Sequence, residues 1–401
     1  MPRPDLLAAI DLGSNSFHLQ VGRVVDRQIY PLDSLREVVR LGAGLTSDKR
    51  IDRATQARAL EALQRIGERL RGLPRGAVRA VGTNTLRVAK NAPQFLREAR
   101  AALGFPIEVI AGREEARLIY LGVAHSMPPA AHNRLVVDIG GGSTEFIVGK
   151  GLDPLLTESL YMGCVSYSLA YFPEGRIEKS RFKKAELAAR QELSGMAGEY
   201  RNTGWQEAVG SSGTARALET ILRETGYSEE GITLEGLEEL KDLLLKHERA
   251  DPDRIAGLRK DRAAVIPGGL AIMLAAFREL GIERMAVSDG ALRHGVLYDL
   301  LGRVQHHDMR EATVTQFMRR YHVDAAQAER VRSLALKIFD AINAEARELD
   351  AERLLLDWAA RLAEAGLSVA HAQYHKHSAY ILSNADMPGF CLLYTSPSPR
   401  D

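Results

Sequence analysis

The chain has few cysteines and few aromatic residues. Only two of its 401 residues are cysteines, Cys164 and Cys391, and aromatic side chains make up 6%. Two cysteines cannot form the dense disulfide framework of a small secreted protein, so a reducing compartment is the simplest expectation. We therefore expect a cytoplasmic protein, and a peripheral association with a membrane stays open.

An excess of one charge and a long apolar run are also absent. Lys and Arg total 53 and Asp and Glu total 52, which gives a net charge of +1. This balance argues against a protein that coats nucleic acid, although a local basic patch for a polyanion is compatible with it. The longest apolar stretch, 263–277, contains Pro267, Gly268 and Gly269 and is shorter than the roughly 20 residues of a membrane span. It predicts a buried helix.

The remaining composition is that of a globular protein, with 45% hydrophobic and 26% charged residues. At about 150 residues per domain, the length suggests two or three domains. Apolar alternation and helical periodicity predict strands at 6–11, 16–25, 78–81, 107–110, 135–138, 144–148 and 285–288, and helices at 52–71, 93–103, 234–247 and 262–280. Beyond about residue 307 the strand signals fade, and helices at 325–347 and 351–365 predict an all-helical domain.

One short motif occurs twice. An apolar strand ends in Asp-x-Gly-x-x-Ser at Asp11, Gly13 and Ser16, and again at Asp138, Gly140 and Ser143. In both copies a second strand follows the turn. Two copies of one strand-turn-strand unit predict two similar domains that face each other.

The motif has the chemistry of a phosphate site. Glycine turns let the backbone approach a ligand closely and direct N–H groups toward phosphate oxygens. An aspartate at the strand end can hold a metal ion that bridges to the phosphate. The alternative is a plain β-hairpin in which Gly and Asn only supply positive φ angles. The matched Asp and Ser spacing of the two copies favours the phosphate site.

Seven ordered segments resemble one known family: AIDLGSNSFHL at 9–19, VGTNTLR at 81–87, AGREEARLIYLGV at 111–123, VVDIGGGSTEF at 136–146, MGCVSYS at 162–168, GSSGT at 210–214 and SDGALRHGVLYDLLGR at 288–303. Together they are similar to the exopolyphosphatase / guanosine pentaphosphate phosphohydrolase family, and closest to its exopolyphosphatase branch. The resemblance extends from about Asp5 to Phe390.

The resemblance implies an α/β fold of the actin-like, sugar-kinase and heat-shock ATPase superfamily. Two ribonuclease-H-like domains, expected at 1–126 and 127–304, would enclose a cleft, followed by an incomplete all-α HD-like domain at 305–390. The metal-binding doublet of an HD domain would fall at Ala363 and Glu364, so we expect no second metal site there. The last residues, 391–401, resemble a translated sequencing adapter and are expected to be an artefact. The family also suggests a homodimer. This expectation stays open because the helical domain is expected to be incomplete.

The resemblance assigns roles to residues. Glu115 matches the family's general base, although acids are common in the first turn of any helix. Asp138 and Glu145 match the acids near Mg²⁺. The phosphate-binding residues expected from the two loops and from the segment at 81–87 are Gly13, Ser14, Asn15, Ser16, Arg87, Gly140, Gly141, Gly142, Ser143 and Thr144. Arg87 has the alternative of a surface arginine at a helix start. Weaker candidates are Asp11, Gly213, Thr214, Asp289 and Arg293.

The leading hypothesis is therefore an exopolyphosphatase that uses Mg²⁺ to release terminal orthophosphate from inorganic polyphosphate. A phosphohydrolase that converts guanosine pentaphosphate to tetraphosphate is the alternative, because both activities use the same loops. A non-catalytic sensor of polyphosphate or alarmone is an alternative of another class, disfavoured by the presence of Glu115 and Asp138. A kinase of the acetate or sugar type is a third, and it would require an acceptor substrate.

Overall fold

Each glycine turn joins two antiparallel strands in the interior of a sheet. β1 (Leu6–Leu12) pairs with β2 (Ser16–Val25), and β6 (Asn133–Ile139) pairs with β7 (Thr144–Lys150). The apolar residues of β1 and β6 are buried without alternation, which is typical of strands covered on both faces. Both predicted hairpins therefore form at the predicted residues.

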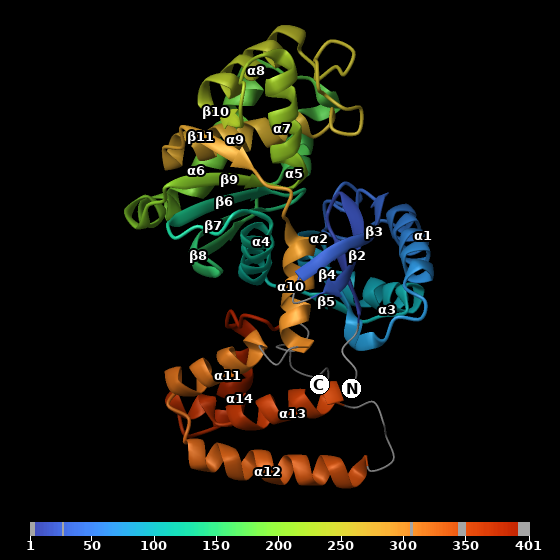
Figure 1. The fold of residues 1–401 in the computed structure, drawn as a ribbon, viewed down its shortest axis with the longest axis vertical. Helices are drawn as coiled ribbons and strands as arrows, with labels where there is room; N and C mark the ends of the chain where they lie inside the picture. Colours follow the sequence, from blue (N-terminus) through green and yellow to red (C-terminus); the bar gives the residue numbers. More distant parts are fainter. Residues whose placement is uncertain (1–4, 26–27, 305–307, 344–349, 392–401) are drawn as a thin grey trace. The chain divides into compact units, whose positions relative to one another are not determined.

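The computed structural model describes residues 5–25, 28–304, 308–343 and 350–391. The chain divides into two compact units, Met1–Leu301 and Gly302–Asp401. The first unit holds both sheets, and the second is helical (Figure 1). Of the expected artefact, Cys391 is described and buried, while 392–401 lie outside the described residues.

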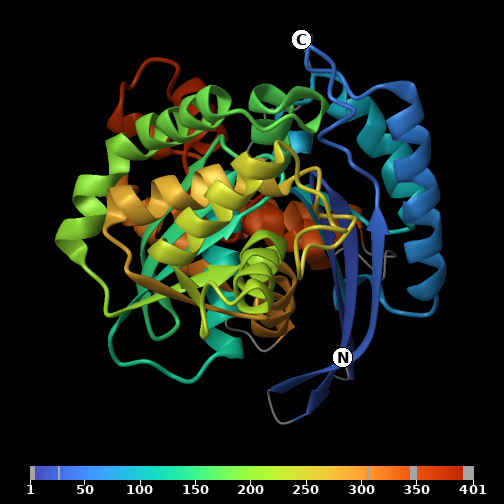
Figure 2. The ribbon, with the colours of Figure 1, turned by 90° about the horizontal axis from the view of Figure 1, so that it is seen from above.

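The first sheet has the strand order β3-β2-β1-β4-β5, with β3 at Gln28–Val38, β4 at Val78–Gly82 and β5 at Ile107–Val109. β1, β4 and β5 run parallel, and β2 and β3 complete an antiparallel meander. Helices α1 (Arg53–Arg69) and α3 (Ala92–Leu103) pack together on the outer side of this sheet (Figure 2). The Asp52 side chain accepts a hydrogen bond from the Thr55 amide and so caps α1.

The second sheet repeats this arrangement, with the order β10-β11-β9-β6-β7-β8. Its further strands are β8 (Asp153–Leu160), β9 (Glu207–Ser211), β10 (Ile232–Thr233) and β11 (Arg284–Val287). β6, β7 and β8 form the antiparallel meander, and β9 and β11 continue it in parallel. The chain therefore contains two copies of one α/β unit, which confirms the predicted class.

The helices of this copy are α5 (Cys164–Tyr171), α6 (Lys179–Thr203), α7 (Ser212–Thr225), α8 (Leu234–His247) and α9 (Ile266–Leu280). α9 is buried along nearly its whole length, as the apolar run predicted, and α5, α6 and α8 pack around it. It begins four residues later than expected, because 262–265 form turns and Pro267 occupies the first helical turn. None of the described helices is both long and apolar enough to cross a bilayer.

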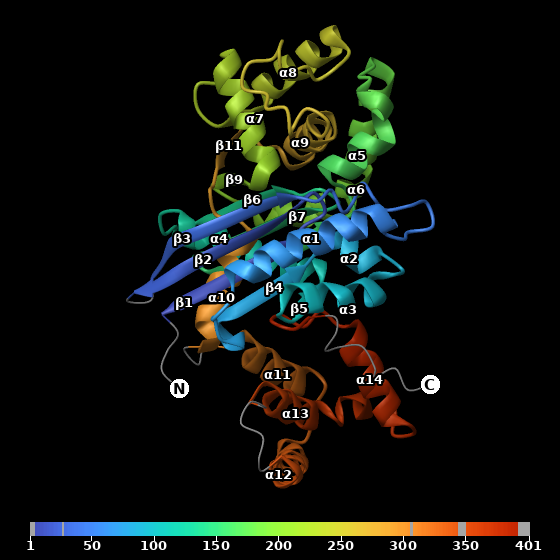
Figure 3. The ribbon, with the colours of Figure 1, turned by 90° about the vertical axis from the view of Figure 1, so that its right-hand side faces the viewer.

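Two helices lie between the sheets. α4 (Gly112–Ser126) packs on β7 and β8, while α10 (Leu292–Val304) reaches β4 through a bond between Arg79 and Asp299. The two helices cross at Gly122 and Gly295, where a Cβ atom on Gly295 would lie 1.7 Å from the carbonyl oxygen of Leu118. Figure 3 shows α10 alongside the first sheet. A short helix, α2 (Asn84–Val88), follows β4.

The second unit consists of α11 (Met309–Arg320), α12 (Ala325–Ile342), α13 (Asp350–Leu362) and α14 (Tyr374–Asn384). Its core contains Val314, Phe317, Trp358, Leu362, Met387 and Phe390. The Trp358 indole donates to Glu311, which satisfies the polar end of this buried ring. The predicted all-helical domain is thus confirmed.

The close crossing of α4 and α10 predicts the effect of two alanine substitutions. Gly295→Ala should destabilise the protein by more than the roughly 1–3 kcal/mol of ordinary overpacking, because the new methyl group meets backbone that cannot move aside. Gly198→Ala in α6 is the matched control, since nothing lies within 4 Å of its Cβ position. It should be neutral or stabilising by up to about 1 kcal/mol. Urea unfolding measures both, and equal stabilities would contradict the crossing.

Candidate functional site

The two glycine loops meet each other. A Cβ atom on Gly142 would lie 3.2 Å from the Ser14 hydroxyl oxygen, and one on Gly141 would lie 3.1 Å from the Ser14 Cβ. The Asn84 side chain donates to the Gly142 carbonyl at 3.1 Å and so ties the first copy to the second. A side chain at Gly141 or Gly142 would therefore crowd Ser14 of the first loop.

The glycines are not explained by backbone conformation. None of the glycines in the two loops has a positive φ, and neither does Asn15. The plain hairpin alternative, in which these residues only supply positive φ, therefore does not apply. The requirement at these positions is close approach, which is also what a phosphate group needs from a loop.

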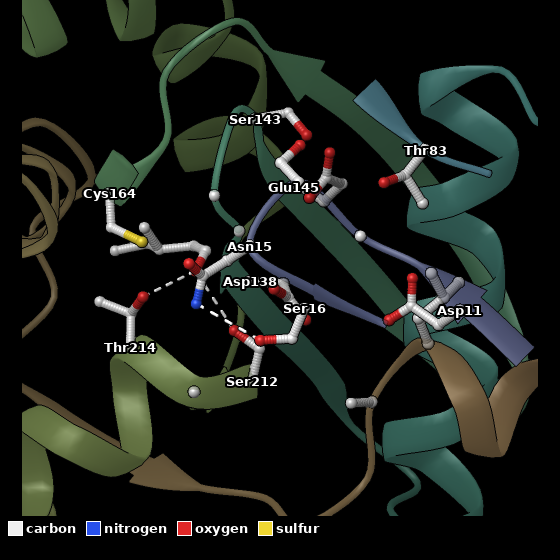
Figure 4. A pocket seen from close by; sticks show the side chains of 18 of the residues that line it. Asp11, Asn15, Ser16, Thr83, Asp138, Ser143, Glu145, Cys164, Ser212 and Thr214 are labelled. Carbon is white, nitrogen blue, oxygen red and sulfur yellow. Dashed lines mark hydrogen bonds between the residues drawn. The ribbon is translucent and has the colours of Figure 1, made fainter. Parts of the chain in front are cut away.

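Most of the predicted site residues line one pocket between the two loops (Figure 4). They are Asp11, Gly13, Ser14, Asn15, Ser16, Glu115, Asp138, Gly140, Gly141, Gly142, Ser143, Glu145, Gly213, Thr214 and Arg293. Asp11 and Asp138, the two copies of the motif aspartate, face the same space although they lie far apart in the sequence. The folded duplication thus brings both predicted loops to a single site.

Three predicted residues are placed differently. The Thr144 hydroxyl donates to the Met162 carbonyl at 2.6 Å, because strand alternation turns Thr144 away from the side that Ser143 occupies. It is not available as a phosphate donor. The Asp289 side chain is 98% exposed and does not line the pocket; its nearest partner is Arg216, at 4.0 Å. Arg87 also does not line the pocket, and its guanidinium donates a hydrogen bond to Glu115.

Arg87 holds Glu115. Its Nη1 donates to Glu115 Oε2 at 2.7 Å and to the Ile110 carbonyl at 2.9 Å, and both side chains are buried. The surface alternative for Arg87 is therefore wrong. Burial raises the pKa of Glu115, and Arg87 opposes this rise. The result is a carboxylate in a fixed orientation whose proton affinity is increased.

Four carboxyl groups share the pocket: Glu115, Asp138 and Glu145 are buried, and Asp11 is half-buried with a buried Oδ1 atom. Asp11 lies opposite His18 across the first hairpin, and Asp138 lies opposite Glu145 across the second. Burial raises the pKa of Asp11 to about 7, with further increases from Glu115 and Asp138. Burial also raises the pKa of Asp138, against hydrogen bonds from Ser211 and Ser212, and raises that of Glu145 together with the charges of Glu115 and Asp138. Such mutual repulsion favours the uptake of a cation.

The donor set fits a hard cation. Asp11 Oδ1 is buried and has no hydrogen-bond partner, and the surrounding donors are carboxylate oxygens. Within the described ranges, no three Asp, Glu, His or Cys side chains are close enough together to ligate one ion. Mg²⁺ suits this arrangement, because it commonly binds through one or two carboxylates and completes its shell with water and substrate oxygens.

Three arginines also line the pocket. They are Arg216, Arg262 and Arg293, and in the described part of the chain Arg262 and Arg293 form no ion pair with a carboxylate. Burial and the neighbouring arginines lower the pKa of Arg262, and Arg293 is affected in the same way. His18 lies here too, and burial with these arginines lowers its pKa to about 3, so it stays neutral.

Arg262 and His18 line the pocket but were not predicted from the sequence as lining residues. Arg262 immediately precedes the apolar run of α9, and a charge at the start of a buried helix was the available signal. Ser212 adopts φ +67, a conformation rare for serine, at the first residue of α7. Cys164 is buried at the pocket wall.

Comparisons with known proteins identify the family that this chain resembles. Residues 20–304 match the model of the Ppx/GppA phosphatase family, and residues 309–392 match the model of its domain III. A solved Ppx/GppA family member from Aquifex aeolicus is similar at 27% identity, over 74% of this chain and 98% of its own, with a TM-score of 0.62. An exopolyphosphatase from Cytophaga hutchinsonii shares the fold at 24% identity, over 75% of this chain and 98% of its own, with a TM-score of 0.66.

The raised pKa of Asp11 predicts a pH-dependent effect of Asp11→Asn. A carboxyl group whose pKa is about 7 in the folded protein and 3.8 when unperturbed destabilises the fold as pH rises between these values. In the presence of a chelator, Asp11→Asn should therefore be more stable than the wild type at pH 8, by at most about 4 kcal/mol. The difference should shrink as pH falls from 7 toward 4. Thermal unfolding across this range measures it, and a difference independent of pH would contradict the assignment.

Proposed function

The chain belongs to the Ppx/GppA phosphatase family, and we propose that it is a Mg²⁺-dependent exopolyphosphatase. In this proposal the enzyme hydrolyses the terminal phosphoanhydride bond of inorganic polyphosphate. One observation carries the proposal: four carboxyl groups and three arginines line a single pocket. In this proposal the last unit of the phosphate chain reacts beside the carboxyl groups while the next units bind the arginines.

Glu115 acts as the general base. Its carboxylate takes a proton from a water molecule, whose oxygen attacks the terminal phosphorus. The bond from that phosphorus to the bridging oxygen breaks, and the shortened chain leaves with the electron pair on that oxygen. A raised pKa brings a carboxylate closer to the working pH and makes it a better base. Arg87 fixes the direction of the carboxylate.

The glycine loops hold the reacting phosphoryl group. Phosphoryl transfer depends mainly on positioning and on stabilisation of charge on the equatorial oxygens. Hydroxyl groups of Ser14, Ser16 and Ser143 line the pocket and are suitable donors for those oxygens. Asp138 and Glu145 would hold Mg²⁺, with Asp11 close by. When bound, Mg²⁺ neutralises negative charge on the phosphate oxygens.

The lining also distinguishes the two candidate substrates. Guanosine pentaphosphate carries a purine base, which proteins commonly bind by stacking on aromatic rings. No Phe, Tyr or Trp lines the pocket among the described residues, whereas three arginines line it. These features favour a substrate made only of phosphate, and guanosine pentaphosphate hydrolysis remains the second candidate.

Replacement of the base tests the proposal. Glu115→Gln should lower kcat for polyphosphate by about 10²–10⁴-fold, because the amide cannot accept the proton from water. KM should change little, since the phosphate-binding groups remain. Phosphate release measured over a range of chain concentrations separates the two constants.

The control for this variant is Glu158→Gln. Glu158 is a partly exposed acid on β8 that pairs with Arg113 and lies outside the pocket. It should leave both constants unchanged. Near-full turnover by Glu115→Gln would remove the general-base assignment.

The arginines that line the pocket predict an effect on KM and not on kcat. Arg262→Gln should raise KM for polyphosphate by about 10–100-fold, the loss expected for one charged hydrogen bond of about 1.5–3 kcal/mol. kcat should change much less, because in this proposal Arg262 binds the phosphate chain and takes no part in the attack by water. Arg254→Gln, which removes an exposed arginine paired with Asp251, is the control. An unchanged KM for Arg262→Gln would exclude Arg262 from substrate binding.

A further inference from the structure

A buried network of five charged side chains lies beside the first turn of α4. Its members come from β4, β5, α4 and α10, and they are Arg79, Glu108, Glu114, Arg117 and Asp299. None of the five lines the pocket. The network nevertheless includes the residue directly before Glu115 in the sequence.

Asp299 connects two arginines that come from different elements. Its Oδ2 accepts a hydrogen bond from Arg79 Nη1 at 2.8 Å, and its Oδ1 accepts one from Arg117 Nη2 at 2.5 Å. Arg117 in turn forms a fork with Glu114, through Nε at 2.8 Å and Nη2 at 2.9 Å. The side chains of Arg79, Glu114 and Asp299 are 1%, 2% and 5% exposed.

Stability alone is a weak explanation for such a network. Buried ion pairs lose much of their Coulomb energy to desolvation, and apolar residues of similar size often give equal or greater stability. What a forked network does provide is a fixed geometry, because each guanidinium binds its carboxylates in one plane.

The start of α4 needs such fixing. Its N-cap residue, Ala111, has no side chain that can accept a bond from the first turn. The fork from Arg117 to Glu114 closes that turn from within, and Asp299 ties it to α10. The glycine crossing of α4 and α10 brings the two helices close together further along. The first turn of α4 also carries Glu115.

We propose that Asp299 is a positioning residue for Glu115. Through Arg117 and Glu114 it holds the first turn of α4 so that the Glu115 carboxylate stays against Arg87 and faces the pocket. The inference rests on the proposed role of Glu115 as the general base. The helix that carries Asp299, α10, also contributes Arg293 to the pocket.

Asp299→Asn tests the inference. The amide keeps the shape of the side chain, but its NH2 group takes the place of one carboxylate oxygen and cannot accept from the arginine that faces it. kcat for polyphosphate should fall by about 10–100-fold, the cost of a base displaced by about 1 Å. KM should stay within about threefold of the wild type, because the phosphate-binding residues are untouched. Asp299→Glu, which restores a carboxylate, should recover part of kcat.

A double variant separates positioning from general damage. In the Glu115→Gln background, Asp299→Asn should reduce the residual turnover by less than about twofold, because the group that it positions is already gone. Losses that multiply would overturn the inference, as would an unchanged kcat in folded Asp299→Asn. If Glu115→Gln itself keeps full turnover, the proposed function fails instead, and the two failures are distinguishable.

The matched control is Glu207→Gln. Glu207 pairs with the buried Arg134 at 2.8 Å on the second sheet, outside the pocket, so its loss also leaves a buried arginine without its acid. It should lower the unfolding temperature without changing kcat. All assays are made below each variant's unfolding transition. Should Asp299→Asn not fold, Arg117→Lys decides, since lysine keeps the charge but cannot form the fork; it should show the same selective loss of kcat, and an unchanged kcat would overturn the inference.

Discussion

The structure of the site depends on one electrostatic constraint, the withdrawal of four carboxyl groups from solvent around a single pocket. Burial raises the pKa of Asp11, Glu115, Asp138 and Glu145, and the charges of Glu115 and Asp138 add to the rise at Asp11 and Glu145. Arg87, which bonds Glu115, does not prevent the rise there. Evolution does not usually keep such a costly cluster without a ligand that compensates it. A divalent cation among the carboxyl groups and a polyanion on the arginines would compensate the negative and the positive charges of the pocket.

The duplicated fold brings these carboxyl groups together in one pocket. Each α/β copy contributes one Asp-ended strand and one glycine loop, and the loops approach closely because no side chain separates them. The copies then differ at the position across the hairpin from the aspartate. It is Glu145 in the second copy and the neutral His18 in the first. This difference is consistent with a metal held mainly by the second copy, and α4, between the sheets, carries Glu115, the proposed base.

The sequence predicted those parts of the site that lie on single continuous motifs. Both hairpins followed from apolar runs that end in Asp and Gly, whereas β3 and β8 were not predicted, because these edge strands mix exposed and half-buried residues. Thr144 was placed in the site by adjacency to Ser143, although strand alternation turns it away. Arg262 could not be placed, since it reaches the pocket only through tertiary packing. The role of Glu115 came from resemblance, and its contact with Arg87 required the fold.

The most direct measurement of the central claim is phosphate release from long-chain polyphosphate and from guanosine pentaphosphate, side by side, with Mg²⁺ and with EDTA. The protein should release phosphate from polyphosphate with Mg²⁺, release it more slowly from guanosine pentaphosphate, and release little from either substrate with EDTA. Absence of release from both substrates with Mg²⁺, or release that EDTA leaves unchanged, would contradict it.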